Sequence, residues 1–302
     1  MPVYLILIAL LILLKSLSSD TGFNRLSQGE CIACHNDFIE KPEIHPQLES
    51  TCDICHIQVG EDHPGNSQKE FVLSDGIPAL CYICHTDMEE HLRSDSNVHF
   101  QSTDTLSCIK CHDPHSSPYP RLVRQGGKDL CLTCHSKTIV TGSSAVMNIG
   151  QLIGSARSVH TAIESGGCII CHAPHYSEKR ALLLGEFPAN QYVSSSLEIY
   201  ELCFWCHDSD LLEAPDTEYG TGFRNGKNNL HFIHSHGEKG RNCTMCHNVH
   251  AGQNEKLIAG TIMYGNWEFS LDFQTKENGG TCLSACHGKK EYDRTISQVL
   301  MP

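Results

Sequence analysis

Cys168-Ile169-Ile170-Cys171-His172 places two thiols two residues apart, with a histidine directly after the second thiol. This CxxCH spacing is typical of covalent c-type haem attachment, in which two thioethers anchor the porphyrin and the histidine ligates the iron. His160 precedes the stretch and His175 follows it closely. The spacing therefore predicts a haem site with further candidate iron ligands on either side.

The same spacing recurs along the chain and uses all 18 cysteines. The eight CxxCH motifs are Cys31/Cys34/His35, Cys52/Cys55/His56, Cys81/Cys84/His85, Cys108/Cys111/His112, Cys131/Cys134/His135, Cys168/Cys171/His172, Cys203/Cys206/His207 and Cys243/Cys246/His247. A ninth motif, Cys282/Cys286/His287, has three spacer residues. A zinc site needs two more ligands at its own spacing, and a disulfide framework does not require a histidine after every second cysteine. We therefore predict nine c-type haems, each with its motif histidine as the first axial ligand.

The chain begins with an apolar run from Leu5 to Leu14, which is short for a membrane-spanning helix. It predicts a secretory signal peptide over residues 1–18, with Ser16-Leu17-Ser18 at the cleavage site. No basic residue precedes the run, so an uncleaved N-terminal anchor stays open as an alternative. Because covalent haem attachment takes place outside the cytoplasm, we expect an exported protein of the periplasm, the outer membrane or the extracellular space.

The segments between the motifs are rich in glycine and polar residues and contain few long periodic apolar stretches. We expect porphyrins to replace a side-chain core, so that folding is coupled to cofactor attachment. The sequence predicts mostly irregular coil with short α-helices, in an elongated, haem-packed molecule. The best longer helix is expected over residues 197–206. The aromatic cluster of Tyr264, Trp267, Phe269 and Phe273 is expected to pack or to form a strand.

Aligning the motifs shows an internal repeat of paired motifs, with one histidine before and one after the first motif of each pair. His99 and His115 flank one first motif, and His160 and His175 flank the next. The repeat predicts a single-haem segment at 19–43 and two-haem modules at 44–97, 98–140, 141–225 and 226–302. The first of these modules is the weakest copy.

Eleven of the 20 histidines lie outside the motifs and are candidate second axial ligands: His45, His63, His91, His99, His115, His160, His175, His231, His234, His236 and His250. The choice among His231, His234 and His236 stays open. The first haem is expected to take His91 or a spare member of that cluster. A histidine just past a motif has little chain with which to fold back under its own ring, so His115 and His175 are expected to reach a neighbouring haem.

These motifs resemble the doubled-CxxCH family of multihaem c-type cytochromes. The CHxPH patterns at His112–His115 and His172–His175 carry the resemblance most specifically, whereas His250 lacks the proline. The resemblance covers nearly all of the chain after the signal. The density of motifs is similar to that of porin-associated cytochromes and of filament-forming cytochromes.

Nine irons with enough histidine to fill both axial positions favour electron transfer, since an iron that reduces a bound substrate needs an open position. We predict an electron carrier without catalytic residues, whose partners are other redox proteins, an outer-membrane porin or further copies in a filament. The formal charge of −13 makes nucleic acid a poor partner. The alternatives are a multihaem reductase of a small oxyanion or nitrogen compound, and a protein whose polymerisation is itself the function.

Overall fold

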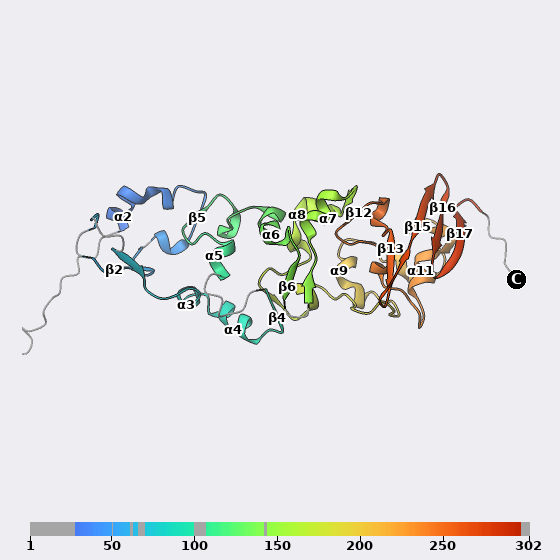
Figure 1. Ribbon diagram of the computed structural model, residues 1–302, viewed down its shortest axis with the longest axis horizontal. Helices are drawn as coiled ribbons and strands as arrows, with labels where there is room; N and C mark the ends of the chain where they lie inside the picture. Colours follow the sequence, from blue (N-terminus) through green and yellow to red (C-terminus); the bar gives the residue numbers. More distant parts are fainter. Residues whose placement is uncertain are drawn as a thin grey trace, which may run out of the picture. The chain divides into compact units, whose positions relative to one another are not determined.

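The computed structural model describes residues 28–49, 51–60, 63–65, 70–99, 107–141 and 144–296, so the predicted signal peptide lies outside the described residues (Figure 1). The chain forms two compact units. The first comprises Met1–Gly76 and Asp113–Leu122, and the second comprises Ile77–His112 and Val123–Pro302. Among the described residues, none of the helices combines the length and the apolar character that crossing a bilayer requires.

The first unit consists of short elements joined by turns. Its helices are α2 (Gln28–His35) and the 3-10 turns η1 (Asn36–Phe38), η2 (Pro46–Glu49) and η3 (Pro120–Leu122). Its strands are β1 (Glu43–Ile44), β2 (His56–Gln58), β3 (Phe71–Leu73) and β5 (Ser116–Ser117). They pair as two small antiparallel sheets, β1 with β5 and β2 with β3.

The Cys31 and Cys52 motifs lie in the first unit, and the second unit holds the other seven motifs. Its α-helices are α3 (Ala79–Tyr82), α4 (Thr86–Ser94), α5 (Ser107–Cys111), α6 (Gly127–His135), α7 (Ile149–Ser155), α8 (Thr161–Gly166), α9 (Glu201–Phe204), α10 (Asp210–Glu213) and α11 (Leu230–Ser235). Its 3-10 turns are η4 (Cys168–Ile170), η5 (Arg180–Leu182), η6 (Glu198–Tyr200), η7 (Cys243–Met245) and η8 (Glu255–Leu257).

The strands of the second unit are equally short, except at its C-terminal end. They are β4 (Asn97–Val98), β6 (Ile139–Thr141), β7 (Ser144–Val146), β8 (Ser158–Val159), β9 (Tyr176–Ser177), β10 (Arg224–Asn225), β11 (Asn228–Asn229), β12 (Ala251–Gly252), β13 (Thr261–Tyr264), β14 (Trp267–Ser270), β15 (Asp272–Lys276), β16 (Gly279–Ser284) and β17 (His287–Asp293). Antiparallel pairs form between β4 and β9, β6 and β7, β8 and β12, β10 and β11, and β13 and β14. Strands β15, β16 and β17 form a three-stranded antiparallel sheet in that order.

Each CxxCH motif lies on a helical or hydrogen-bonded turn. The histidine N–H donates to the carbonyl of the first cysteine, at 3.0 Å for His56 and 2.9 Å for His112. Residues i, i+3 and i+4 of such a turn share one face, so both thiols and the imidazole project to the same side. The ninth motif differs: Cys282 belongs to β16 and His287 begins β17, with an irregular register between Cys282 and Ser284. Its third spacer residue therefore accompanies a β-hairpin instead of a helical turn.

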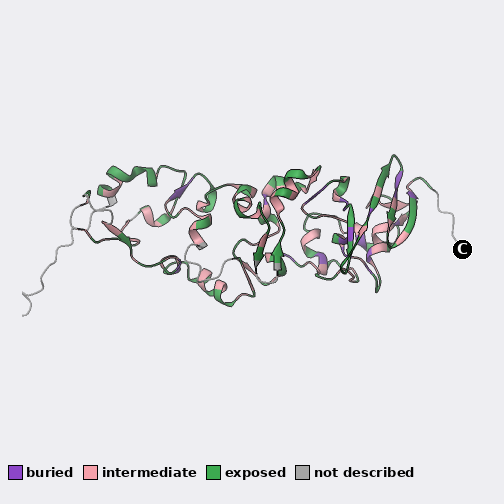
Figure 2. Ribbon diagram, viewed as in Figure 1, coloured by how far each residue is buried: buried purple, intermediate pink, exposed green. Residues whose placement is uncertain are grey.

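Little of the described chain is buried, and most residues are exposed or half-buried (Figure 2). The hydrophobic core cluster consists of Ile258, Ala259, Ile262 and Leu271, between the eighth and ninth motifs. Phe269, Phe273, Cys246 and Cys282 pack against this cluster. Because the apolar side chains find few protein partners elsewhere, the chain leaves apolar surface for a prosthetic group to cover.

The architecture is mixed coil, short helices and small sheets, so the sequence-based expectation of coil with short helices was incomplete. The small sheets, and the three-stranded sheet above all, were not predicted. The helix expected over residues 197–206 is shorter and divided into η6 and α9. Of the aromatic cluster, Phe269 and Phe273 pack against the core, whereas Tyr264 and Trp267 are exposed on β13 and β14.

Candidate haem-binding sites

Eight motif histidines lie beside a histidine from outside the motifs. The pairs are His35 with His63, His56 with His115, His99 with His135, His112 with His175, His160 with His207, His172 with His250, His231 with His247, and His234 with His287. Every pair joins one motif histidine to one candidate second ligand, and no histidine is used twice. Within the described part of the chain, the structure thus brings together at least sixteen of the sequence-predicted iron ligands in pairs of the expected composition.

The spacing within these pairs is uniform. Their ring centroids are 6.0 to 6.4 Å apart. Two imidazoles that ligate one metal ion from opposite sides, through metal–nitrogen bonds of about 2 Å, have centroids about 6 Å apart. The other aromatic pairs scatter from 3.6 Å for Phe232 and His236 to 6.3 Å for Phe273 and Tyr292. The donor set and its spacing therefore fit an iron bound between two imidazoles.

The ring planes divide the pairs into two groups. In six pairs the interplanar angle lies between 11° and 24°. In the His160–His207 and His234–His287 pairs it is 52°. Both of these pairs contain the histidine of a second motif in a predicted module.

The sequence did not show which of His231, His234 and His236 lie beside motif histidines, and the structure distinguishes them. His231 lies beside His247 and His234 beside His287, whereas His236 packs flat on Phe232 at 3.6 Å. His91 likewise packs on Tyr176, with 4.1 Å between ring centroids. These two stacked rings are therefore not among the eight pairs.

His85, which closes the motif at Cys81 and Cys84, is the motif histidine that the eight pairs do not include. Its N–H donates to the Cys81 carbonyl at 3.0 Å, as in the other motifs, and it caps the N-terminus of α4. The local turn at His85 therefore has the expected form. Its role as an axial ligand stays a prediction from the sequence, and so do the second-ligand roles of His45, His91 and His236.

The predicted attachment cysteines differ in how far the protein covers them. Cys34, on α2, and Cys286, in the turn between β16 and β17, are exposed, whereas Cys55 is half-buried. The N–H of Cys55 donates to the Cys52 carbonyl at 3.2 Å, and its own carbonyl accepts from the N–H of Ser74 at 2.9 Å. The shared motif spacing does not reveal these differences, and thioether formation at Cys34, Cys55 and Cys286 stays a prediction.

One expectation about the first haem differs from the structure. The sequence pointed to His91 or a spare member of the later cluster as the second ligand for the Cys31 motif. Instead, His63 lies 6.0 Å from His35, and Glu70 holds its Nδ1 at 2.6 Å. His63 stands later in the chain than its counterparts in the other modules, and this irregular spacing was the signal that its neighbours differ from theirs.

A two-residue β-pairing, repeated three times, positions the flanking histidines. The strand that ends just before His45, His99 or His160 pairs with the strand that begins just after His115, His175 or His250. The N–H of the preceding histidine donates to the carbonyl of the following one, at 2.9, 2.8 and 2.9 Å. These antiparallel pairs therefore hold two candidate ligands of successive modules side by side.

Burial lowers the pKa of several candidate ligand histidines. Burial, followed by the nearby charges of His247 and His234, lowers the pKa of His231 to about 4. Burial is also the main cause that lowers the pKa of His99, His160 and His250. A neutral imidazole is the form that ligates a metal, so the lowered pKa values favour the ligating form of these side chains.

Within each unit, thiols of several consecutive motifs lie close together, and all eighteen cysteines are free of disulfides. Burial, and then the thiol of an adjacent motif, raises the pKa of one cysteine in each of these pairs: Cys52 by Cys31, Cys111 by Cys134, Cys171 by Cys206, Cys243 by Cys203, and Cys246 by Cys282. For Cys131, whose pKa is also raised, the hydrogen bond with Cys168 comes first and burial second. The Cys31 and Cys52 sites are therefore neighbours in space, and so are successive sites from the Cys108 motif to the Cys282 motif.

Two buried tyrosine hydroxyls lack a hydrogen-bond partner in the described chain, those of Tyr82 and Tyr200. Tyr200 is fully buried beside Cys203 and Cys243, and Tyr82 lies near Cys108 and Cys81. A buried hydroxyl normally finds a partner. Each of these two hydroxyls lies beside the attachment cysteines of two successive motifs. A polar group of a porphyrin, such as a carboxylate, fits there as the missing partner.

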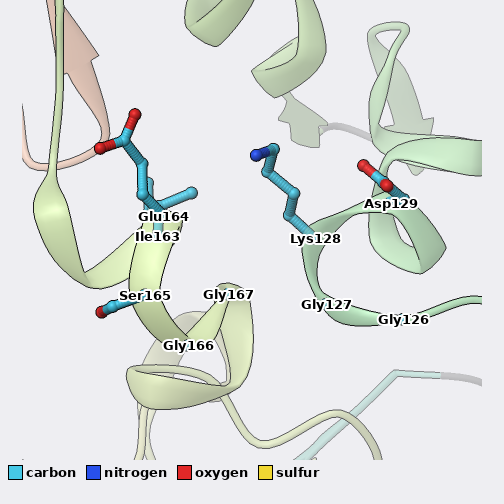
Figure 3. Close-up of a pocket in the computed structure, with 9 residues that line it drawn as sticks. All are labelled: Gly126, Gly127, Lys128, Asp129, Ile163, Glu164, Ser165, Gly166 and Gly167. Atoms are coloured by element: carbon cyan, nitrogen blue, oxygen red, sulfur yellow. The ribbon is translucent and has the colours of Figure 1, made fainter. Parts of the chain in front are cut away.

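A cavity of about 320 Å³ lies between the segments that lead into Cys131 and Cys168. Figure 3 shows Lys128 and Glu164 on its two sides, with Gly126, Gly127, Gly166 and Gly167 below them. Gly167 has a φ of +76°, and an added Cβ would lie 3.3 Å from the backbone of Gly127, so glycine permits this close approach. None of the predicted attachment or ligand residues lines the cavity. Its lining residues come from the two segments that precede Cys131 and Cys168 in the sequence.

Comparison with known proteins also points to haem-binding motifs. The family model for the doubled CXXCH motif matches residues 45–90, 99–139 and 160–211. These matches begin at His45, His99 and His160, the histidines that precede first motifs. The chain is also 24% identical over 197 residues to the multiheme cytochrome MtrA of Shewanella baltica (strain OS185). That match covers 59% of this chain and 51% of the relative, so it spans about half the relative's length.

Proposed function

Because the chain belongs to the doubled-CxxCH family of multihaem c-type cytochromes, we propose that it binds nine covalent haems and conducts electrons along them outside the cytoplasm. Electron transfer is the activity that this family membership supports. The observation that carries the fuller proposal is the set of eight histidine pairs, each with one motif histidine and a spacing that suits a single iron. Each haem iron, when bound, exchanges one electron between its ferric and ferrous states.

In this proposal the paired histidines are the two axial ligands of eight irons, and the eighteen motif cysteines form the thioethers. Two imidazoles on one iron would leave no open position there for a substrate. Histidines that follow a first motif, such as His175 and His250, ligate an iron of the preceding module. Histidines that precede a first motif, such as His99 and His160, ligate the second iron of their own module. His45 holds the same preceding position in the first module.

The thiol neighbours support an order for the path. In the second unit, successive attachment sites follow the sequence from the Cys108 motif to the Cys282 motif, and Tyr82 links the Cys81 motif to Cys108. In the first unit, Cys31 lies beside Cys52. We propose that electrons pass from site to site in this order within each unit.

We propose an exported protein, in the periplasm, the outer membrane or the extracellular space, which exchanges electrons with other redox proteins. A porin of the outer membrane and further copies of this chain are the two candidate structural partners. The family membership supports redox partners in general. The proposed haem number and the short apolar N-terminal run both agree with export, because haem attachment takes place outside the cytoplasm.

The experiment is maturation of the full chain in a host that attaches c-type haem, followed by denaturing mass spectrometry and electron paramagnetic resonance of the ferric protein. We expect the mass of the chain plus nine haems, and low-spin iron throughout. Eight haems would leave the Cys282 motif empty. A stoichiometric high-spin signal would overturn the closed-ligand proposal and favour the reductase, which activity assays with nitrogen oxyanions would then test.

A further inference from the structure

The three predicted modules that end at residues 140, 225 and 302 share an unusual turn after their first motif. Two successive residues have left-handed backbone conformations: Arg121 and Leu122 (φ 61° and 58°), Ala181 and Leu182 (52° and 56°), and Lys256 and Leu257 (54° and 57°). Each pair begins nine residues after the motif histidine, at His112, His172 and His247. Non-glycine residues rarely adopt this conformation, and such strain persists only where the surroundings impose it.

Backbone hydrogen bonds of the same kind impose the turn in each copy. The residue after the motif histidine donates to the second left-handed residue: Asp113 to Leu122, Ala173 to Leu182 and Asn248 to Leu257, at 2.7 to 2.8 Å. A residue beyond the turn donates back to the second motif cysteine: Arg124 to Cys111, Leu184 to Cys171 and Ala259 to Cys246, at 2.8 to 2.9 Å. Isolated bridges join His112 to Val123, His172 to Leu183 and His247 to Ile258.

Different side chains complete the same arrangement. The Ser177 hydroxyl donates to the Leu183 carbonyl at 2.7 Å, and the Asn254 amide donates to the equivalent Ile258 carbonyl at 3.0 Å. A serine in one copy and an asparagine in the other donate to the equivalent backbone carbonyl. The copies therefore share the geometry of the turn and differ in the side chains around it.

The turn presents a carbonyl to the motif histidine. Nδ1 of His172 lies 2.9 Å from the Ala181 carbonyl, and Nδ1 of His247 lies 2.9 Å from the Lys256 carbonyl. A carbonyl only accepts, so Nδ1 carries the proton and Nε2 is left to ligate. Nδ1 of the second-motif histidines His135 and His207 makes no hydrogen bond of this kind to any described residue, and Nδ1 of His287 lies 2.7 Å from the adjacent Gly288 carbonyl.

We propose that Ala181 and Lys256 are positioning residues, whose strained turns fix the tautomer of His172 and His247 and lower the reduction potentials of those haems below those at His135 and His207. The inference rests on the proposed function. An imidazole whose N–H donates to a carbonyl is a more basic ligand and stabilises the ferric iron. Reduction adds one electron to the iron, and Nδ1 keeps its proton in both states. The sites from His135 through His172 and His207 to His247 therefore alternate in potential along the path.

The test uses the full haem-loaded protein and matched variants at Ala181. A β-branched residue does not tolerate the left-handed conformation, whereas glycine adopts it freely. Ala181→Val should shift one of the haem potentials upward and leave the others in place, while Ala181→Gly should leave all of them unchanged. Lys256→Val and Lys256→Gly should repeat this contrast at a different haem. Valine and glycine variants with superimposable redox titrations would overturn the inference.

Haem content and spin state, measured on the same samples, separate this inference from the proposed function. Nine low-spin haems with unmoved potentials would overturn the turn's role alone, whereas missing haems in the unsubstituted protein would overturn the proposed function. If neither valine variant matures, hydrogen exchange of the imidazole Nδ1 protons in the unsubstituted, reduced protein decides. The protons of His172 and His247 should exchange more slowly than those of His135 and His207, and equal rates would contradict the proposal.

Discussion

The ring of His175 lies 6.0 Å from that of His112, although His175 follows the Cys168 motif and His112 closes the Cys108 motif. His250 and His172 repeat this relationship one module later, and His115 and His56 show it in the first unit. A histidine that follows one motif thus lies at the site of an earlier motif. The expectation that His115 and His175 reach a neighbouring site agrees with these positions.

Replacement of His175 by alanine should open one axial position without loss of haem. We expect about one ninth of the ferric iron to become high-spin, because a single second ligand is removed. Tyr219→Ala is the control, since this side chain is 93% exposed and is not a candidate ligand, and it should leave the spin state unchanged. Adding Cys108→Ser and Cys111→Ser to His175→Ala should abolish the high-spin signal. A signal that survives in this combined variant would place the His175 ligand at another iron.

The two ring-plane groups should be visible in the ferric spectrum. The relative orientation of two axial imidazoles sets the splitting of the iron d orbitals, so the two sites at 52° should give a low-spin signal distinct from those at 11° to 24°. Replacement of Cys203 and Cys206 by serine removes one of the two sites and should diminish the minority signal. An unchanged minority signal in that variant would contradict the assignment.

Tyr200→Phe tests the buried hydroxyl. In the protein alone this hydroxyl has no partner within the described residues, and its removal should then be neutral or stabilising. If the hydroxyl donates to a haem carboxylate, its loss from the loaded protein should cost about 1 kcal/mol of stability and lower the melting temperature. Tyr219→Phe is the control, since Tyr219 is 93% exposed. Equal melting temperatures for the two variants would argue against a haem partner.

The sheet that carries the ninth motif can be tested through its glycines. A Cβ at Gly279 would lie 1.9 Å from the Tyr292 carbonyl on the adjacent strand, so Gly279→Ala should force β16 and β17 apart and cost about 2 kcal/mol or more. Gly288, on β17 of the same sheet, has no atom within 4 Å of an added Cβ. Gly288→Ala should therefore leave thermal unfolding unchanged. A similar loss in both variants would show that the close approach does not determine stability.

The attachment chemistry could be predicted from the sequence because it depends on residues within six positions of one another. The partners of His115, His175 and His250 depend on contacts between modules, which the sequence does not show. Strands of two residues, such as β4 and β9, are too short to show an alternating pattern. The turns at Arg121, Ala181 and Lys256 carry no glycine, so the usual signal for a left-handed conformation is absent. His63 was a candidate ligand, but only the structure places it beside His35.

In the proposed arrangement of modules, each first site except the last lies beside a histidine from the following module, which gives the chain a rule of assembly that is independent of its length. Insertion of a whole module between two existing ones would supply a new following histidine to the module before it and receive one from the module after it. His231, beside His247, closes the series at the C-terminal end, and His63, beside His35, closes it at the other. Duplication of a single genetic segment could therefore extend such a series by two haems at a time, without redesign of either terminus.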